Sequence, residues 1–282
     1  MVFRTESGKP VGRIGQGTWY LGESPARRRQ ECSALRAGLE AGMNLIDTAE
    51  MYGEGAAEEL VGEAIQGSAR EDLFLVSKVY PFNAGRNHIF ESCEDSLRRT
   101  KTDYLDLYLL HWRGSIPLRE TVECMEELKA KGRIRAWGVS NLDIADMEEL
   151  FAQPNGVNCA ANQVLYHLGS RGIEYDMLPL MQKRQIPVMA YCPLAQAGRL
   201  RRGLTQNPTL CRIAQEHHAS VTQIMLAFLL TRPGVIPIPR TGNAAHTIEN
   251  ARAEEIRLKP EDLARIDQVF APPKHRVRLE IV

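Results

Sequence analysis

Short runs of apolar residues alternate along the chain with longer segments in which apolar residues recur every three or four positions. The first pattern predicts buried strands, and the second predicts amphipathic helices. The helical segments include residues 27–42 and 118–132, and both end at a glycine, which is a common helix stop signal. The strand-like runs lie at residues 14–19, 44–49, 73–79, 105–112, 134–141, 159–167, 186–194 and 234–240.

The strand-like runs are continuously apolar, as in parallel strands that are covered on both faces. Eight strand–helix units without a Pro/Ser-rich linker favour a single α/β domain over residues 1–282, a closed (β/α)8 barrel of the TIM type. A doubly wound open sheet is the main alternative. Residues 3–13 place a polar turn between two short strand-like stretches, so we expect an N-terminal β-hairpin that caps the barrel bottom.

The charge and apolar content exclude several classes of protein. Lys+Arg and Asp+Glu each total 35, so the formal net charge is zero, which argues against a general nucleic-acid or membrane-surface role. The apolar fraction of 44% is enough for a core. The longest apolar run, residues 224–230, is far too short to span a bilayer. We therefore expect a protein without membrane or nucleic-acid partners.

The six cysteines show neither a C-x-x-C pair nor the spacing of a zinc site or a disulfide framework. This pattern predicts free thiols in a reducing compartment and no bound metal. The N-terminal residues lack the apolar core of a signal peptide. We expect a cytoplasmic protein, and a monomer because no heptad or long apolar edge stands out.

Polar and aromatic residues stand at the ends of the expected strands. In a (β/α)8 barrel, the active site is built from these ends and from the loops that follow them. Polar groups there are costly to bury unless they are paired or used. These strand-end residues are Trp19, Asp47, Lys78, His111, Trp112, Ser140, Asn141, Gln163, Tyr191 and Arg240.

Six motifs are together similar to the aldo-keto reductases, in the order expected for that family. They are IDTAEMYG (46–53), LVSKVYP (75–81), LYLLHW (107–112), GVSNL (138–142), NQVLYH (162–167) and AYCPLAQAG (190–198). The resemblance covers nearly the whole chain, and GQGTWYLGE (15–23) and VYPFNAG (79–85) look most like bacterial members that reduce methylglyoxal and related aldehydes. It implies NADPH-dependent reduction of small or aromatic aldehydes to alcohols by hydride transfer.

Four residues have the acid–base character that this reaction needs, and Tyr52 is the expected proton donor. A phenol titrates near pH 10, about three units above neutrality. We expect the Lys78 ammonium to lower this pKa and Asp47 to pair with the ammonium. His111 is expected to direct a ring N–H at the substrate oxygen. Taken singly, each has an ordinary explanation as a packing or solvated residue, and Glu50 is expected to be a local hydrogen-bonding or solvated residue without a catalytic role.

The hydride has to come from a bound cofactor, because no side chain donates one. The sequence has no Rossmann or P-loop fingerprint, and the resemblance implies NADPH held without a Rossmann domain, with NADH as the weaker alternative. It also implies that Ser140, Asn141 and Gln163 hold the nicotinamide carboxamide and that Tyr191 stacks on the ring. The expected cofactor residues are Trp19, Asp47, Ser140, Asn141, Gln163, Tyr191, Pro193, Leu194, Gly198, Leu200, Ile238, Arg240, Thr241, His246, Glu249 and Asn250.

The adenosine end of the cofactor is expected at residues 238–250. Arg240-Thr241 stands where many family members have Lys-Ser, and His246 stands where they have Arg. Arg240 can still bind a 2′-phosphate through two nitrogens. Because a neutral His246 supplies less charge than Arg, the margin of NADPH over NADH is expected to be reduced. The basic run at 199–202 either adds charge along the pyrophosphate or is solvated.

Aromatic walls suit a small carbonyl substrate with some apolar surface. The expected substrate contacts are Trp19, Tyr52, Phe82, His111 and Trp112. One alternative function is a cofactor-binding regulatory subunit on the same barrel, as in potassium-channel β subunits, but the complete acid–base set argues for turnover. A barrel hydrolase would need two facing carboxylates, and only one acid is well placed.

Overall fold

The computed structural model of the protein describes residues 3–196 and 199–282. Backbone amides of Gly15 and Gly17 donate to the carbonyls of Pro237 and Pro239, and a parallel bridge joins Gly17 to Arg240, so the last strand meets the first. The closed sheet confirms the eight parallel strands predicted above and excludes an open doubly wound sheet. In spatial order, the strands are β1 (Gln16–Gly17), β2 (Leu45–Asp47), β3 (Phe74–Val79), β4 (Leu105–Leu110), β5 (Ile134–Ser140), β6 (Asn162–Leu165), β7 (Val188–Tyr191) and β8 (Val235–Pro237).

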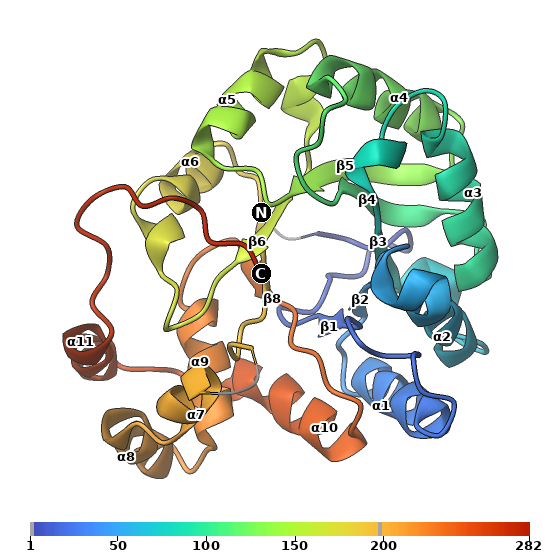
Figure 1. Ribbon diagram of the computed structural model, residues 1–282. Coiled ribbons are helices and arrows are strands. Elements are labelled where there is room, and N and C mark those ends of the chain that lie inside the picture. The colour runs from blue at the N-terminus through green and yellow to red at the C-terminus, as the bar shows by residue number, and fades with distance from the viewer. Residues whose placement is uncertain (1–2, 197–198) are drawn as a thin grey trace.

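Helices surround the sheet (Figure 1). The α-helices are α1 (Arg28–Glu40), α2 (Ala56–Ala64), α3 (Ile89–Thr100), α4 (Leu118–Ala130), α5 (Ile144–Ala152), α6 (Met177–Lys183), α7 (Arg199–Thr205), α8 (Pro208–Glu216), α9 (Val221–Leu230), α10 (Ala244–Arg252) and α11 (Pro260–Val269). Short 3-10 helices are η1 (Tyr52–Gly55), η2 (Arg70–Asp72), η3 (Pro81–Asn83), η4 (Gly156–Asn158), η5 (Gly172–Glu174) and η6 (Ala253–Glu255). None of the helices in the described ranges is long and apolar enough to cross a membrane.

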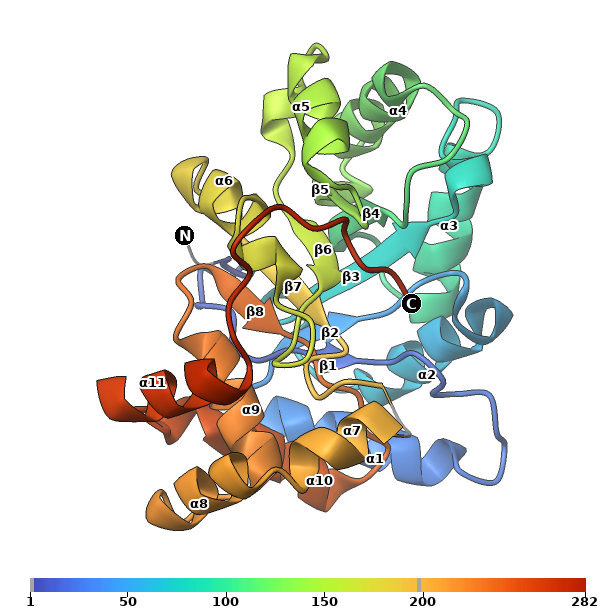
Figure 2. The ribbon, with the colours of Figure 1, turned by 60° about the vertical axis from the view of Figure 1, so that its left-hand side comes forward.

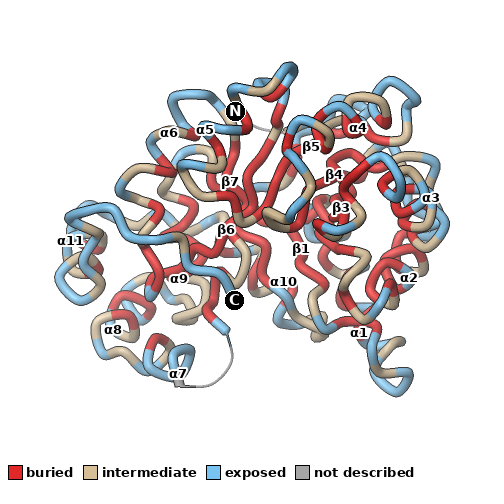
Figure 3. The backbone as a smooth tube through the Cα atoms, turned by 45° about the horizontal axis from the view of Figure 1, so that its top comes forward, coloured by how far each residue is buried: buried red, intermediate tan, exposed pale blue. Residues whose placement is uncertain are grey.

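The strands are apolar throughout because both of their faces are buried. Leu45 and Val76 point into the barrel, whereas Ile46 and Leu75 pack against the surrounding helices. Figure 3 shows the buried residues concentrated along the strands and on the inner sides of the helices. This two-sided burial explains why the strands gave continuous apolar runs in the sequence.

The N-terminal segment turns back on itself with a single antiparallel bridge, between Arg4 and Pro10, beside a backbone hydrogen bond from Val11 to Phe3. The Phe3 ring stacks on Phe74 of the barrel interior, with 4.7 Å between ring centroids. Pro10 has no N–H to donate to a ladder. In place of the expected hairpin of two strands, the described part of this segment is therefore a turn with one bridge.

The carboxyl ends of the strands open on one side of the barrel. The last residues of the chain follow an extended path from α11 across the loops at this side (Figures 1 and 2). Ile281 and Val282 line a cavity there. The loops after the strands and this final segment together position the candidate site.

Candidate active site

A cavity of about 650 Å³ opens at the carboxyl ends of the strands. Its wall combines residues from the loops after six of the strands and Gln163 of β6 with residues of α7, α9 and α10. The expected site residues that line it are Trp19, Asp47, Tyr52, His111, Trp112, Ser140, Asn141, Gln163, Tyr191, Pro193, Leu194, Ile238, Arg240, Thr241, His246, Glu249 and Asn250.

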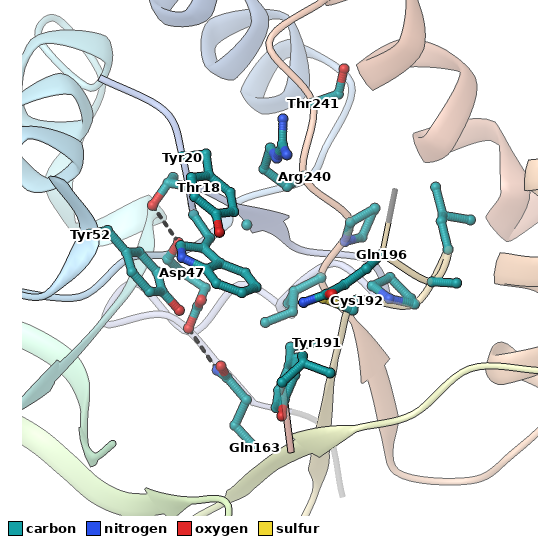
Figure 4. A pocket seen from close by; sticks show the side chains of 18 of the residues that line it. Thr18, Tyr20, Asp47, Tyr52, Gln163, Tyr191, Cys192, Gln196, Arg240 and Thr241 are labelled. Atoms are coloured by element: carbon teal, nitrogen blue, oxygen red, sulfur yellow. Dashed lines mark hydrogen bonds between the residues drawn. The ribbon is translucent and has the colours of Figure 1, made fainter. Parts of the chain in front are cut away.

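Lys78, at the end of β3, forms the centre of a buried polar cluster. Its Nζ donates to Asp47 Oδ2 at 2.8 Å, to the Thr48 carbonyl at 2.8 Å and to Tyr52 Oη at 3.0 Å. An ammonium has three protons, so each of them has an acceptor. The other Asp47 oxygen accepts from Gln163 Nε2 at 2.7 Å, a bond that is drawn in Figure 4. The cluster therefore fixes Tyr52 relative to both charges.

Burial dominates the electrostatics of the cluster. It raises the pKa of Asp47 and lowers the pKa of Lys78, and the attraction between the two groups opposes both shifts. The Lys78 side chain is 0% exposed and that of Asp47 is 3% exposed, so water screens this pair very little. Removing either partner would leave the other as an uncompensated charge.

The pKa of Tyr52 is raised well above its ordinary value, first by burial and then by the negative charge of Asp47. The expected lowering by the Lys78 ammonium is thus outweighed, because burial penalises the phenolate more than the ammonium favours it. A phenol with a raised pKa keeps its proton at neutral pH. Tyr52 is consequently in the protonated form that a proton donor requires.

Tyr52 reaches the cavity because the chain turns sharply after β2. Gly53, Glu54 and Gly55 have φ values of 57°, 53° and 95°, so three consecutive residues are left-handed. Glycine adopts this conformation without steric cost, which explains the two glycines of the motif. The Tyr52 side chain packs with Ala49 in a small apolar cluster beside the cavity.

His111 follows β4 and is 7% exposed. Burial and the nearby Lys78 charge lower its pKa to about 2, so the imidazole is neutral at physiological pH. The ring meets that of Tyr52 edge-on, with 5.7 Å between centroids. Its buried Nδ1 has no hydrogen-bond partner among the described residues, and such a group is costly unless it is used. The two rings thus present polar atoms to the same space.

Amide and hydroxyl groups gather after β5, β6 and β7. Ser140 Oγ donates to the Gln163 carbonyl at 2.9 Å, and Asn141 Nδ2 donates to Ser140 Oγ at 3.2 Å. The Tyr191 hydroxyl donates to Asn141 Oδ1 at 2.9 Å. These groups offer both donors and acceptors beside an aromatic ring, a set that fits a nicotinamide carboxamide.

Cations gather at the other end of the cavity. Arg240 follows β8 with its guanidinium 5.8 Å from the centre of the Tyr20 ring, and Figure 4 shows the two side by side. His246 lies in the first turn of α10, and Arg201 reaches the cavity from α7. Glu249 Oε1 accepts from the Thr222 hydroxyl at 3.3 Å. Exposed cations of this kind fit the phosphate groups of a nucleotide.

Three of the expected residues, Phe82, Leu200 and Lys78, do not line the cavity. Phe82 is 63% exposed, because η3 turns its ring outward to stack on Tyr80 at 4.6 Å between centroids. Leu200 is 51% exposed and does not line the cavity. Lys78 lies behind the cavity wall and acts through the groups that it contacts. Gly198 lies outside the described residues.

The sequence did not single out several of the lining residues. Thr222 belongs to α9, whose apolar pattern gives no sign of a ligand contact. Ile281 and Val282 lie in the extended final segment, where no periodicity indicates which side chains face the cavity. The others are Gly17, Thr18, Met51, Cys192, Ala195, Gln196, Pro239 and Gly242.

Within residues 3–196 and 199–282, no three or more His, Cys, Asp or Glu side chains come together as a metal site would require. The six cysteines are free thiols, four of them buried.

Comparison with known proteins adds to this geometry. The model of the Aldo/keto reductase family matches residues 13–271. The chain belongs to the aldo/keto reductase family. That match spans all eight strands and every helix, so the family relation covers the whole barrel.

Two relatives of this aldo/keto reductase have named activities. It is 56% identical to Methylglyoxal reductase YeaE of Escherichia coli (strain K12) over 269 residues, which cover 95% of this chain and 94% of that protein. It is 36% identical to Glyoxal reductase of Bacillus subtilis (strain 168) over 83% of this chain and 81% of that protein. An aldo/keto reductase from Klebsiella pneumoniae in complex with NADP and acetate has a TM-score of 0.96 and 54% identity, over 100% of this chain and 99% of that one.

Proposed function

We propose that this protein reduces aldehydes to alcohols with NADPH, with 2-oxoaldehydes such as methylglyoxal among its substrates. The observation that carries the proposal is the buried Lys78–Asp47–Tyr52 cluster, which opens beside His111 on a cavity fit for a nucleotide. Methylglyoxal reductase YeaE and the NADP-bound Klebsiella pneumoniae enzyme support the substrate class and the cofactor.

Bound NADPH supplies a hydride to the carbonyl carbon. Tyr52 Oη and the His111 ring face the space where the carbonyl oxygen would lie, and both can hydrogen-bond to it. As negative charge develops on that oxygen, Tyr52 transfers its proton to it. The Lys78 ammonium, 3.0 Å from Tyr52 Oη, then stabilises the phenolate, and Asp47 holds the ammonium in place. The alcohol leaves, and a solvent proton restores the phenol.

We propose that Ser140, Asn141 and Gln163 hold the nicotinamide carboxamide and that the Tyr191 ring packs against the nicotinamide. Their mutual hydrogen bonds support this assignment, because they leave the side chains fixed before the cofactor binds. Trp19 and Trp112 would form the aromatic walls of the substrate space.

The remaining cofactor residues are assigned in the same way. Arg240, Thr241 and His246 would bind the 2′-phosphate, while Glu249 and Asn250 would contact the adenine. We expect NADH to bind more weakly than NADPH, because it gives Arg240 no phosphate to hold. Pro193, Leu194 and Ile238 also line the cavity and would complete its wall along the nucleotide.

The alternatives have less support. A regulatory subunit without turnover has no use for a complete acid–base cluster. A carboxylate-pair hydrolase would need a second acid facing Asp47, and Glu50 instead accepts hydrogen bonds from Tyr80 and Asn83. We further propose that residues 1–282 form one domain that works as a monomer in the cytoplasm.

The test measures NADPH oxidation through the loss of nicotinamide absorbance. Methylglyoxal is the substrate, and NADH is the comparison cofactor. Tyr52→Phe should lower kcat by about a hundredfold to ten-thousandfold, because the proton donor is lost. NADPH affinity, measured by fluorescence titration, should stay unchanged. Wild-type protein that binds NADPH but reduces no aldehyde would favour the regulatory subunit instead.

A further inference from the structure

Two carboxylates outside the cavity fasten the segment that carries Tyr52 to β3 and the loop that follows it. Glu50 Oε1 accepts from the backbone N–H of Tyr80 at 2.6 Å and from Asn83 Nδ2 at 3.3 Å. Glu58 Oε1 accepts from Ser77 Oγ at 2.5 Å. Ser77 and Tyr80 lie on either side of Lys78 along the chain. The segment is thus held to β3 before the lysine that contacts Tyr52, and to the loop that directly follows β3 after it.

Glu58 is joined to a third element. Its Oε2 accepts from Arg99 Nε of α3 at 2.5 Å, and its side chain is 0% exposed. The Arg99 side chain fills the space where a Cβ on Gly55 would lie, since that atom would come within 2.5 Å of it. The ion pair therefore packs directly against the turn that follows Tyr52.

A buried ion pair of this kind contributes little to stability by itself, because apolar side chains of similar volume often replace such pairs without loss. Its position suggests a geometric role. Between Tyr52 and α2 the chain passes through the left-handed residues Gly53, Glu54 and Gly55. Two glycines give this turn wide conformational freedom, so the local backbone alone does not fix the tyrosine.

We propose that Glu50 and Glu58 are positioning residues for the reduction, which hold Tyr52 Oη at hydrogen-bond distance from Lys78 Nζ. Neither carboxylate lines the cavity, so neither contacts substrate or cofactor. Glu58 instead fixes one end of the Tyr52 segment against β3, and Glu50 fixes the other end against the loop that follows β3. The inference rests on the proposed function, because it concerns the same proton transfer.

The charge of Glu58 also reaches the lysine. Lys78 is faced by Asp47 of β2, by Tyr52 of η1 and by His111 after β4, with Glu58 of α2 behind the strand. Burial lowers the pKa of Lys78, and the charges of Asp47 and Glu58 raise it. Neutralising Glu58 therefore lowers the pKa of Lys78, and the ammonium is lost at a lower pH.

The experiment compares Glu50→Gln, Glu58→Gln and Ser77→Ala with the wild-type protein. The matched control is Glu63→Gln, since Glu63 lies on the same helix as Glu58 but forms its ion pair with Arg28 near the surface. For each protein we would measure kcat and KM for methylglyoxal over a range of pH, the Kd for NADPH by fluorescence, and the thermal midpoint. Ser77→Ala removes the hydrogen bond from Ser77 to Glu58 but leaves the Glu58–Arg99 pair in place. It therefore tests this contact even if Glu58→Gln fails to fold.

Loss of the hydrogen bonds made by either Glu50 or Glu58 should lower kcat by about tenfold to a hundredfold, because small displacements of a reacting group have effects of this size. The KM and the Kd for NADPH should stay within about twofold. In Glu58→Gln, the alkaline limb of the plot of kcat against pH should also move to lower pH. Glu63→Gln should match the wild type.

The proposal would be overturned if the folded variants kept wild-type kcat, or if kcat fell only in proportion to the folded fraction. It would also fail if the Kd for NADPH rose as much as kcat fell. A wild-type protein without aldehyde turnover would count against the proposed function instead, so the two failures are distinguishable.

Discussion

At one end of the cavity, Lys78, Asp47 and Tyr52 are buried and bonded to one another, whereas at the other end Arg240 and His246 are exposed. In the described part of the chain, no ion pair joins Arg240 or His246 to a carboxylate. The buried end is arranged before any ligand arrives, which suits chemistry that depends on sub-ångström placement. The exposed end can adjust to a charged ligand and contributes chiefly affinity. Substitutions at the two ends should consequently change different quantities.

The largest effect is expected from Lys78→Met at the buried end. The change removes the group that stabilises the Tyr52 phenolate, so kcat should fall by about a hundredfold to ten-thousandfold. It also leaves Asp47 buried without its charge partner, which should cost about 3–5 kcal/mol of unfolding free energy. Urea denaturation and turnover measured on one preparation would check both. A variant that lost activity but no stability would contradict the buried pair described above.

Buried and exposed histidines should differ in how they affect stability at acid pH. Burial lowers the pKa of His167 to about 4 and that of His111 to about 2. Unfolded histidine titrates near pH 6.5. Stability is therefore complete above about pH 6.5, and it falls as the pH drops because only the unfolded state gains protons. In this range, each histidine should lower the free energy of unfolding by about 1.4 kcal/mol for every pH unit that the pH falls.

His167→Asn tests this directly, because an amide oxygen can replace the ring nitrogen that accepts from the Gly169 N–H. Between about pH 6 and pH 4.5, the slope of unfolding free energy against pH should decrease by the contribution of roughly one proton taken up on unfolding. His88→Asn is the control, since that side chain is exposed. An unchanged slope in His167→Asn would show that the buried ring is protonated in the folded state.

At the exposed end, Arg240→Ala should weaken NADPH binding by roughly tenfold through loss of charge-assisted hydrogen bonds to phosphate. The Kd for NADH and the kcat at saturating NADPH should hardly change. Fluorescence titration with both nucleotides at two ionic strengths would check this, because salt screens an exposed contact. An equal loss for NADH would place Arg240 at the pyrophosphate rather than at the 2′-phosphate.

The smallest effect is expected from His246→Arg, which adds a permanent charge at the first turn of α10. NADPH binding should tighten by roughly threefold, as is typical of one exposed charge pair. The ratio of the Kd for NADH to the Kd for NADPH would be measured. A ratio that stayed constant would mean that residue 246 does not face the 2′-phosphate.

The same contrast explains what could be predicted from the sequence. The eight-stranded barrel followed from the apolar runs. The expected pairing of Lys78 with Asp47 depended on the resemblance to the aldo-keto reductases as well as on their places near the ends of adjacent strands. The raised pKa of Tyr52 did not follow, because it depends on how completely the ring is buried. Phe82 was expected to contact the substrate, but the chain after β3 turns in η3 and directs its ring outward. No periodicity in the sequence shows the direction of that turn.

The final segment shows another limit. Ile281 and Val282 reach the cavity only because the chain after α11 crosses the open side of the barrel (Figure 2). A segment without helix or strand carries no periodic signal, so its contacts depend on the tertiary path alone. Glu50 was expected to be a local hydrogen-bonding or solvated residue, but it accepts a hydrogen bond from Tyr80 in the loop after β3, a partner that could not be identified before the loops were placed.

The seam between β1 and β8 also affects how the protein folds during its synthesis. At this seam the acceptors are Pro237, the last residue of β8, and Pro239, just after the strand. Neither proline has an N–H, so the seam lacks the return bonds that these two residues could otherwise make. It also joins the strands that lie furthest apart in the chain, and such contacts carry the highest loop-closure cost. During synthesis, the outer edge of β1 stays without its partner until β8 has left the ribosome. Barrel closure therefore requires the last strand, and until that strand is available β1 presents an unpaired edge, the feature of a sheet that favours aggregation.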